Sequence, residues 1–281
     1  MRIVPAPQQI EGGGFVVRRP FPVHGLSYVD PFLLIDEMGP VEYAPGKAIG
    51  APDHPHRGFE TVTYLLSGGM EHEDSHGHRG ALRPGDVQWM TAGAGVIHSE
   101  LPSSEMLERG GRMHGFQIWV NLPARLKMAT PRYQEYAAQQ LPFVETSGAH
   151  VRIIAGEYGG RRSPIETTVP TTMLHVNLDA GASAAFAIAP RSNAIVHAIS
   201  GSAAVQGKQL PEHNAALFEP SPGVLDVSAN EGRFEALVLA AVPLGEPVAR
   251  YGPFVMNTAD ELQQAFEDFQ AGRFGEIARV S

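Results

Sequence analysis

The sequence predicts an all-β protein made of two related β-domains, with a short helix near the C-terminus. The segments that look regular are short, and their apolar and polar residues alternate with period two, as in half-buried strands. They end at Gly, Pro, Asn or Asp. The 281 residues include 31 Gly and 23 Pro, enough for the many turns that such an architecture needs.

In the first half of the chain, this alternation predicts strands at Glu60–Leu66, Asp86–Met90 and Gly115–Leu122. Turns are expected at Ser67–Gly69 and Arg83–Asp86. From Pro123 to about Ala149 the alternation is lost, and we interpret this stretch as a connecting segment.

In the second half, strands are predicted at Thr172–Leu178, Ala194–Ile199, Ala215–Glu219, Leu225–Ser228 and Phe234–Ala241. The similar rhythm of both halves indicates two related domains, expected at residues 1–135 and 136–281. The chain then changes character, because Thr258–Glu261 has the pattern of a capping box. A helical apolar stripe follows at Leu262, Phe266 and Phe269, and Gly272 is expected to end the helix, which would lie on a sheet.

Composition and charge exclude several classes of protein. Hydrophobic residues make up 43% and charged residues 18% of the chain, as in a globular protein. The formal net charge is −9 and no basic run is present, so direct nucleic-acid binding is not expected. No apolar run of signal-peptide or membrane-span length is present, and we expect a cytoplasmic protein and a monomer. The absence of Cys excludes thiolate metal sites, so nitrogen and oxygen must hold any metal.

Two short pairs of metal-competent side chains carry most of the functional information. They are His54-Pro55-His56 and His98-Ser99-Glu100. On an extended strand, i, i+2 spacing puts both side chains on one face, about 7 Å apart at the backbone. Two such strands facing each other would gather three imidazoles and one carboxylate around a metal ion. Spacing alone does not decide which carboxylate would bind the metal. Glu60 lies an even number of residues from His54 and His56 and would share their face on an extended strand.

A family resemblance rests on these motifs. The pattern Gly50-x3-His54-x-His56-x3-Glu60-x7-Gly68 resembles the first cupin motif, and Gly85 through His98 resembles the second. Three longer blocks, distributed over nearly the whole chain, resemble the pirin family within the cupins: His54–Val62, Pro84–Gly93 and Gly252–Thr258.

The resemblance implies a bicupin fold of two jelly-roll barrels, with the metal in the N-terminal domain and none in the C-terminal domain. General cupin usage would choose Glu60 as the carboxylate ligand. The pirin pattern chooses His54, His56, His98 and Glu100, and leaves Glu60 close by, behind the ligands or facing the substrate. The implied ion is Fe(II), although the donor set also suits Mn, Ni, Co, Cu and Zn.

The resemblance also implies a function. Bacterial proteins similar to pirin are associated with quercetin 2,3-dioxygenase activity, in which a flavonol or related aromatic substrate and O₂ react and carbon monoxide is released. Glu100 is the candidate to ligate the metal and to take the phenolic proton. The alternative is a non-catalytic iron-binding regulator whose partner is a transcription factor or a metabolic enzyme.

Other histidines and aromatic residues are weighed against these pairs. The segment Glu71–His78 is rich in His and carboxylates, but we expect it to be a solvated hairpin loop or part of the rim of the first site. His175 and His197 have no partner at i+2 and are expected to be structural. Trp89 and Trp119 are expected in the core. Residues of their strands that face the ligand side could line a pocket for a flat substrate.

Overall fold

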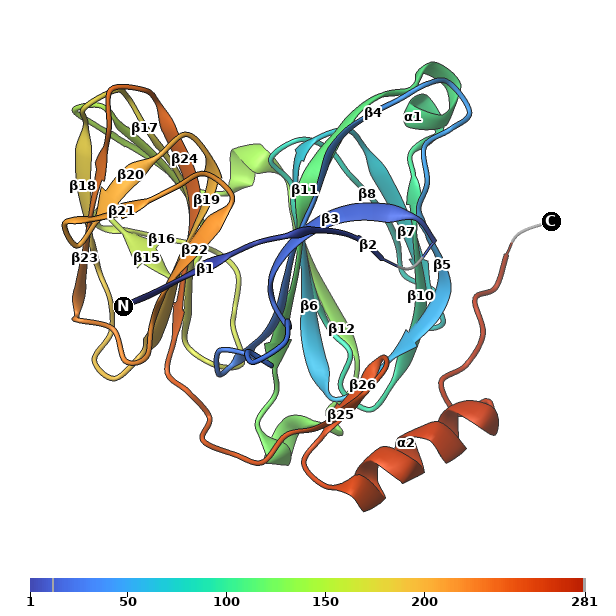
Figure 1. Ribbon diagram of the computed structural model, residues 1–281. Coiled ribbons are helices and arrows are strands. Elements are labelled where there is room, and N and C mark those ends of the chain that lie inside the picture. The colour runs from blue at the N-terminus through green and yellow to red at the C-terminus, as the bar shows by residue number, and fades with distance from the viewer. Residues whose placement is uncertain (12, 280–281) are drawn as a thin grey trace. The chain divides into compact units, whose positions relative to one another are not determined.

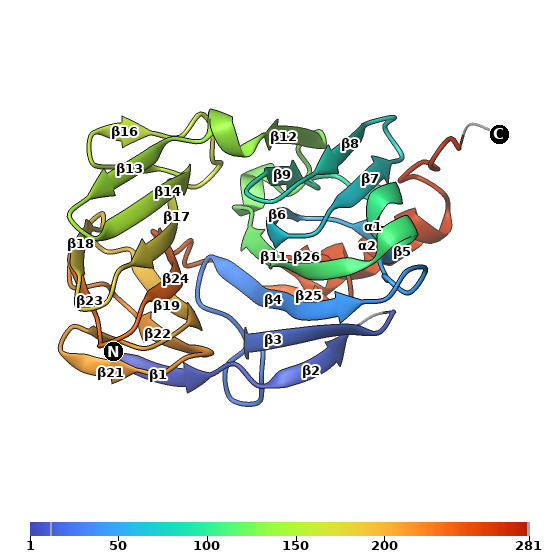
Figure 2. The same ribbon diagram turned by 90° about the horizontal axis from the view of Figure 1, so that it is seen from above.

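The computed structural model describes residues 1–11 and 13–279 (Figure 1, Figure 2). Contacts divide them into two units. The histidine unit comprises residues 8–18, 32–138 and 245–279, and the apolar unit comprises residues 1–7, 19–31 and 139–244. The prediction of an all-β chain with a short C-terminal helix is confirmed.

The histidine unit contains two antiparallel sheets. Its large sheet has the order β12-β9-β6-β11-β4-β3-β2 and its small sheet the order β5-β10-β7-β8. The large-sheet strands are β2 Gln8–Glu11, β3 Phe15–Phe21, β4 Phe32–Tyr43, β6 Phe59–Ser67, β9 Val87–Thr91, β11 Gly111–Asn121 and β12 Arg132–Tyr136. The small-sheet strands are β5 Ala51–His56, β7 Met70–Asp74, β8 Arg79–Leu82 and β10 Val96–Pro102. The remaining elements are α1 Ser104–Arg109, η1 Ala124–Leu126, the hairpin of β25 Ala249–Tyr251 and β26 Phe254–Met256, and α2 Ala259–Gln270.

The apolar unit also has a large and a small sheet. Their orders are β1-β22-β19-β24-β17-β14-β13 and β18-β23-β20-β21. The large-sheet strands are β1 Arg2–Pro5, β13 Phe143–Thr146, β14 Ala149–Ala155, β17 Thr171–Leu178, β19 Asn193–Ser200, β22 Asn214–Phe218 and β24 Phe234–Ala241. The small-sheet strands are β18 Ser183–Ala187, β20 Ala203–Val205, β21 Lys208–Leu210 and β23 Val224–Ala229. A short hairpin is formed by β15 Glu157–Tyr158 and β16 Arg161–Arg162, and η2 spans Ala138–Gln140.

Most predicted strands are found where they were expected. Seven of the eight begin and end within one residue of the predicted bounds, and β11 begins four residues earlier, at Gly111. The stretch Pro123–Ala149 is more than a connection, because it contains β12 and β13. Edge strand β12 was missed because most of its residues are only half-buried, which weakens the apolar alternation.

The ends of the chain depart from the expected division at residues 135 and 136. Strand β1 pairs with β22, so the first residues belong to the apolar unit. The C-terminal helix instead belongs to the histidine unit, where Ala265 and Phe266 pack with Phe254 and Phe274. The reason is burial, since the apolar stripe of α2 finds its partners in the β25–β26 hairpin and in Ile97 of β10.

Local signals determine where α2 begins. The predicted capping box is present, because the Thr258 hydroxyl accepts from the Glu261 backbone N–H and the Glu261 carboxylate accepts from the Thr258 N–H. The helix ends at Gln270, with Ala271 as its C-cap, slightly before the predicted stop at Gly272.

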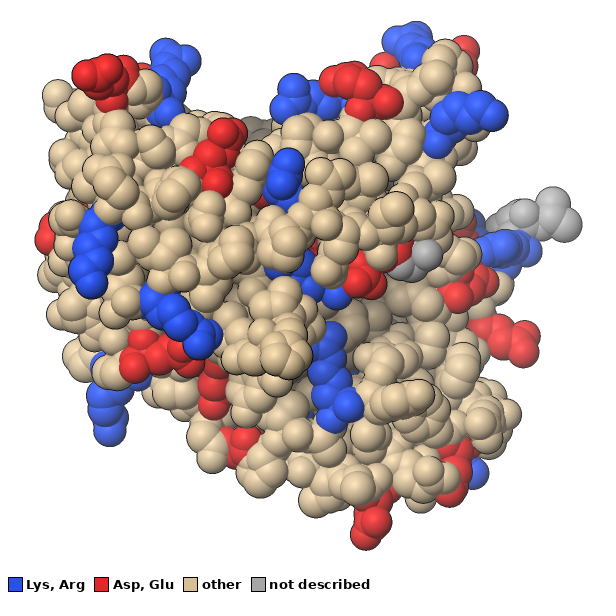
Figure 3. Space-filling view, viewed as in Figure 1, with Lys and Arg blue, Asp and Glu red and all other residues tan. Residues whose placement is uncertain are grey.

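No helix among residues 1–11 and 13–279 is long and apolar enough to cross a membrane. On the face seen in Figure 3, Lys and Arg side chains are scattered among Asp, Glu and uncharged surface, and the described residues of that face form no continuous basic stretch.

Candidate metal centre

Three histidines converge in the interior of the histidine unit. Strands β5 and β10 are antiparallel neighbours in the small sheet, with His54 opposite His98 and His56 opposite Val96 (Figure 1). Strand alternation therefore places all three imidazoles on the same face. One ligand atom from each ring lies within 4.8 Å of the other two, and no other group of three such residues is found in the described part of the chain.

The hydrogen bonding of these rings suits metal ligation. Nδ1 of His54 lies 2.7 Å from the carbonyl oxygen of Pro52, which makes Nδ1 the donor and leaves Nε2 with its lone pair. Nδ1 and Nε2 of His98 have no hydrogen-bond partner among the described residues. Buried polar atoms normally have partners, so a ring buried in this way fits a metal ligand.

Burial also keeps two of the rings neutral. His98 is 0% exposed and His56 3% exposed. Burial, followed by the neighbouring His54, lowers the pKa of His56 and of His98 well below the ordinary histidine value. Both rings are therefore uncharged at neutral pH, and the neutral imidazole is the form that binds a metal.

An aromatic wall borders the triad. Trp119 on β11 and Phe59 on β6 contact the His56 ring edge-on, with centroid distances of 5.2 and 5.1 Å. Trp89 is completely buried, and strand alternation places it on the opposite face of the large sheet from its neighbours Gln88 and Met90. Of the two tryptophans considered from the sequence, Trp119 is therefore the one beside the triad.

Glu100 lies at the edge of the triad. Its Oε2 is 3.9 Å from Nε2 of His98, and its Oε1 accepts a 2.8 Å hydrogen bond from the Thr63 hydroxyl across the interior. The pairing of β10 with β5 shifts register between His98 and Glu100, so Glu100 faces Ala51. The carboxylate is thus held beside the histidines by a residue of the opposite sheet.

Glu60 lies elsewhere. Thr63 points into the interior towards Glu100, so alternation along β6 turns Glu60 to the outer face. There Oε1 of Glu60 accepts a 2.8 Å hydrogen bond from Thr91 of β9. His56 and Glu60 do not share a face, although four residues separate them, because Gly58, at φ +87°, turns the chain between β5 and β6. The resemblance placed Glu60 behind the ligands or facing the substrate, and the structure shows it on the outer face of the large sheet, hydrogen-bonded to Thr91.

The segment Glu71–His78 also differs from expectation. Residues Met70–Asp74 form β7, and His72 and Asp74 are 3% and 2% exposed instead of lying in a solvated loop. β7 pairs with β10, so that His72 faces Glu100 and Asp74 faces His98. The period-two pattern Met70-x-His72-x-Asp74 was a usable strand signal, but the polar inward residues concealed it.

A second polar group lies next to this strand. The His72 ring contacts the Glu135 carboxylate at 2.5 Å and stacks on the Tyr133 ring, with centroids 5.5 Å apart. A Cβ on Gly80 would collide with His72 and Glu135, so glycine makes room for this pair. Burial would raise the pKa of Glu135, but hydrogen bonds from His72 and Gln88 outweigh it and lower that pKa. Sequence reasoning missed Glu135 and Tyr133 because both lie on β12.

His175 and His197 of the apolar unit point away from its core. On β17 and β19 the core residues include Leu174, Val176 and Val196, so alternation puts His175 and His197 on the opposite faces of their strands. His175 forms a 2.8 Å contact with Glu235, in agreement with a structural role.

Comparison with known proteins identifies the family. The family model described as Pirin matches residues 14–120, and the one described as Pirin C-terminal cupin domain matches residues 173–275. The chain belongs to the pirin family. Pirin of Mus musculus is 43% identical over 274 residues, covering 95% of this chain and 91% of that protein. A pirin-like protein of Solanum lycopersicum is 40% identical over 270 residues, covering 95% and 89%.

A solved structure of high similarity supports the fold. The crystal structure of quercetin 2,3-dioxygenase from Acinetobacter baumannii matches with a TM-score of 0.92 and 36% identity, covering 99% of this chain and 98% of that one. The resemblance to the pirin family and the predicted cupin fold are thereby confirmed. In this pirin, the three histidines form a triad that could hold a metal ion.

Proposed function

We propose that this pirin is a metal-dependent dioxygenase that uses O₂ to cleave a flavonol such as quercetin and releases carbon monoxide. The observation that carries the proposal is the triad of converging imidazoles, two of them fully buried. The A. baumannii quercetin 2,3-dioxygenase, which this chain matches over nearly its full length, supports the substrate class.

The donor set determines which ions fit. Nε2 of His54 and the imidazoles of His56 and His98 would hold the ion, and Glu100 would complete a set of three nitrogens and one oxygen. Such a set suits Fe(II), our proposed ion, and also Mn, Ni, Co, Cu or Zn. The bound ion would supply a Lewis acid with coordination positions left for ligands other than the protein.

The surrounding residues have separate tasks. Glu100 is the base that takes the proton of the flavonol 3-hydroxyl, and the Thr63 hydroxyl orients it by occupying Oε1. Trp119 and Phe59 supply flat apolar surface beside the triad, which suits an aromatic ring. Both atoms of O₂ enter the depside product while one carbon leaves as carbon monoxide, so no external reductant is consumed.

The proposal is tested by loading the purified protein with Fe(II) under anaerobic conditions and then adding O₂ and quercetin. We expect metal-dependent loss of quercetin with release of one carbon monoxide per turnover. His56→Ala should abolish this turnover, with His175→Gln in the apolar unit as the matched control. Turnover that persists in His56→Ala would refute the proposed site.

The same preparation separates the enzyme from a regulator. If iron in its two oxidation states changed the capture of a protein partner while no carbon monoxide formed, the regulatory alternative would replace the proposal. A cytoplasmic location and a monomeric state remain predictions, which fractionation of the host cell and sedimentation of the purified protein would test.

A further inference from the structure

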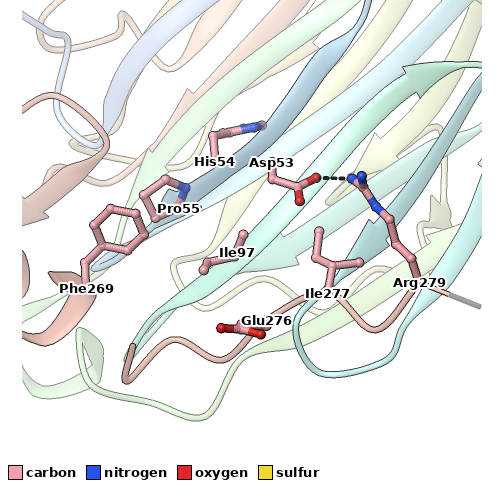
Figure 4. A pocket seen from close by; sticks show the side chains of 8 residues that line it. All are labelled: Asp53, His54, Pro55, Ile97, Phe269, Glu276, Ile277 and Arg279. Carbon is pink, nitrogen blue, oxygen red and sulfur yellow. Dashed lines mark hydrogen bonds and ion pairs between the residues drawn. The ribbon is translucent and has the colours of Figure 1, made fainter. Parts of the chain in front are cut away.

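The two residues that flank the ligand pair on β5 are both tied to the C-terminal segment. Asp53, immediately before His54, forms a 2.5 Å ion pair with Arg279. Arg57, immediately after His56, forms a 2.6 Å ion pair with Asp268 of α2. The segment 268–279 thus forms ion pairs with the residues on both sides of His54-Pro55-His56 (Figure 4 shows the Asp53 pair).

The contact at Arg57 is the more strongly built of the two. Arg57 is 4% exposed, and its guanidinium lies 4.6 Å from the centroid of the Phe274 ring. Nε donates to the carbonyl oxygen of Ala94 at 2.7 Å while Nη1 donates to Asp268. Since Ala94 lies in the turn that enters β10, this one side chain joins β5, β10 and α2, and so both ligand strands.

Asp268 is organised to receive Arg57. Gln264 donates to its Oδ1 at 2.8 Å, and Arg273 also contacts Oδ1, which leaves Oδ2 for Arg57. The hydrogen bond from Arg57 lowers the pKa of the Asp268 carboxyl. The carboxylate therefore stays ionised over the whole physiological pH range and keeps its grip on Arg57.

β5 needs such support because it is the edge strand of its sheet. Its neighbour in the small sheet is β10, so backbone pairing holds His54 and His56 from one side. The C-terminal segment supplies support from the outer face. Beside the Asp53–Arg279 pair lies a pocket of about 430 Å³, where Pro55 and Ile97 on the strands lie across from Phe269 and Ile277 (Figure 4).

The Pro55 and Ile97 side chains point away from the triad, because they alternate with the inward histidines on the same strands. The pocket is therefore lined by the outward side chains of the two ligand strands, and it also reaches His54 itself.

We infer that residues 268–279 are a positioning clamp for the metal ligands, in which Asp268 and Arg279 hold Arg57 and Asp53 and thereby set how tightly β5 presents His54 and His56 to a metal. The inference rests on the proposed metal centre. Arg57 and Asp268 carry most of the effect, because exposed pairs such as Asp53–Arg279 contribute little. Groups behind metal ligands commonly change metal affinity by about 10- to 100-fold when they are replaced.

The test uses the full chain and Co(II) as the probe, because its visible absorption reports coordination geometry. Affinity is measured by chelator competition, and the unfolding midpoint of the metal-free protein is recorded for each variant. Asp268→Asn keeps the shape and removes the charge, and we expect about tenfold weaker Co(II) binding with an altered spectrum. Arg279→Ala should weaken binding by about twofold.

The apolar unit offers matched controls. Glu235→Gln removes the charge of a carboxylate that contacts a histidine, and Arg162→Ala removes an exposed ion pair with Glu157. Neither should change Co(II) affinity or spectrum. Arg57→Lys keeps the charge but cannot bond Ala94 and Asp268 at the same time. Its Co(II) affinity should lie between those of the unsubstituted protein and Asp268→Asn.

The outcomes separate the clamp from the metal centre. If Asp268→Asn and Arg279→Ala bind Co(II) with the affinity and spectrum of the unsubstituted protein, the clamp is refuted even when their unfolding midpoints fall. If the unsubstituted protein binds no Co(II), the metal centre and the clamp are refuted together.

Discussion

The histidine unit and the apolar unit have closely similar strand orders but interiors of different chemistry. The large sheets differ at one edge, where β12 lies in the histidine unit and β1 in the apolar unit. Each has one seven-stranded and one four-stranded sheet, and β5-β10-β7-β8 corresponds strand by strand to β18-β23-β20-β21. In the first set the inward residues include His54, His98 and His72. In the second the paired inward residues are apolar, with Ala184 opposite Val227 and Phe186 opposite Leu225.

This difference lies in the inward side chains and not in the strand order of the small sheets. The strand pair β18–β23, which carries Ala184 and Val227, occupies the place in the sheet order that β5–β10 occupies in the histidine unit. The apolar unit fills its interior with packed aliphatic and aromatic side chains, which stabilise it by burial. The histidine unit gives up part of that apolar burial for buried imidazoles and carboxylates.

The largest effect is expected from removing a ligand. His98→Ala should lower metal affinity by more than ~100-fold, beyond the range seen for groups that only support ligands. His175→Gln, an outward histidine of the apolar unit, should leave the bound metal unchanged. Metal analysis after dialysis against a defined metal buffer compares the two, and equal metal content would contradict the assignment.

The next effect concerns the apolar interior. Phe234 is 1% exposed in the core of the apolar unit. Phe234→Ala should lower the free energy of unfolding by about 3–5 kcal/mol through the cavity it leaves, without changing metal affinity in the folded protein. Denaturant unfolding and metal titration measure both quantities, with Phe234→Leu as the milder control. A parallel loss of metal affinity would show that the interiors are not independent.

A buried cation gives the histidine unit a pH dependence. Nζ of Lys127 donates to Gly58 O, Asn121 Oδ1 and Val255 O at 2.7–2.9 Å, and burial lowers the pKa of Lys127 from 10.5 to about 8. The unfolded chain therefore binds this proton more tightly, so stability from this group rises as the pH increases from about 8 to 10.5.

This contribution is about 3 kcal/mol across that window, because one pKa unit corresponds to about 1.4 kcal/mol. The unfolding free energy is measured at several pH values for the native protein and for Lys127→Met. Between about pH 8 and 10.5 it should rise by this amount more in the native protein than in the variant. Parallel curves would contradict the shifted pKa. Lys208→Met, an exposed lysine of the apolar unit, is the control and should leave the slope unchanged.

The smallest effect is expected at Thr63. Thr63→Val keeps the shape but removes the hydroxyl that donates to Glu100, and should cost about 1 kcal/mol of stability. Because Glu100 loses its orientation, kcat for flavonol cleavage should fall several-fold with little change in KM. Thr171→Val removes a comparable buried hydroxyl bond in the apolar unit, to Val169. It should alter stability alone, and an equal fall in kcat in both variants would refute the specific role of Thr63.

Sequence patterns predicted local features well because local chemistry determines them. Period-two alternation located β6, β17 and β24 closely, since one buried face is enough to produce it. The Thr258 capping box located the start of α2 for the same reason. The pattern was weaker on β7, because its inward residues His72 and Asp74 are polar and conceal the apolar period.

The sequence by itself determined the all-β architecture, the nitrogen and oxygen character of any metal site, and the three histidines that could form it. Only the tertiary structure decided where the two candidate carboxylates lie, because Glu100 is held 3.9 Å from His98, whereas the chain turns at Gly58 and places Glu60 on the outer face. It also decided that the C-terminal segment contacts the end of β5 through the ion pair of Arg57 with Asp268. Alternation is a property of one strand, whereas pairing across 211 residues depends on the packing of the whole unit.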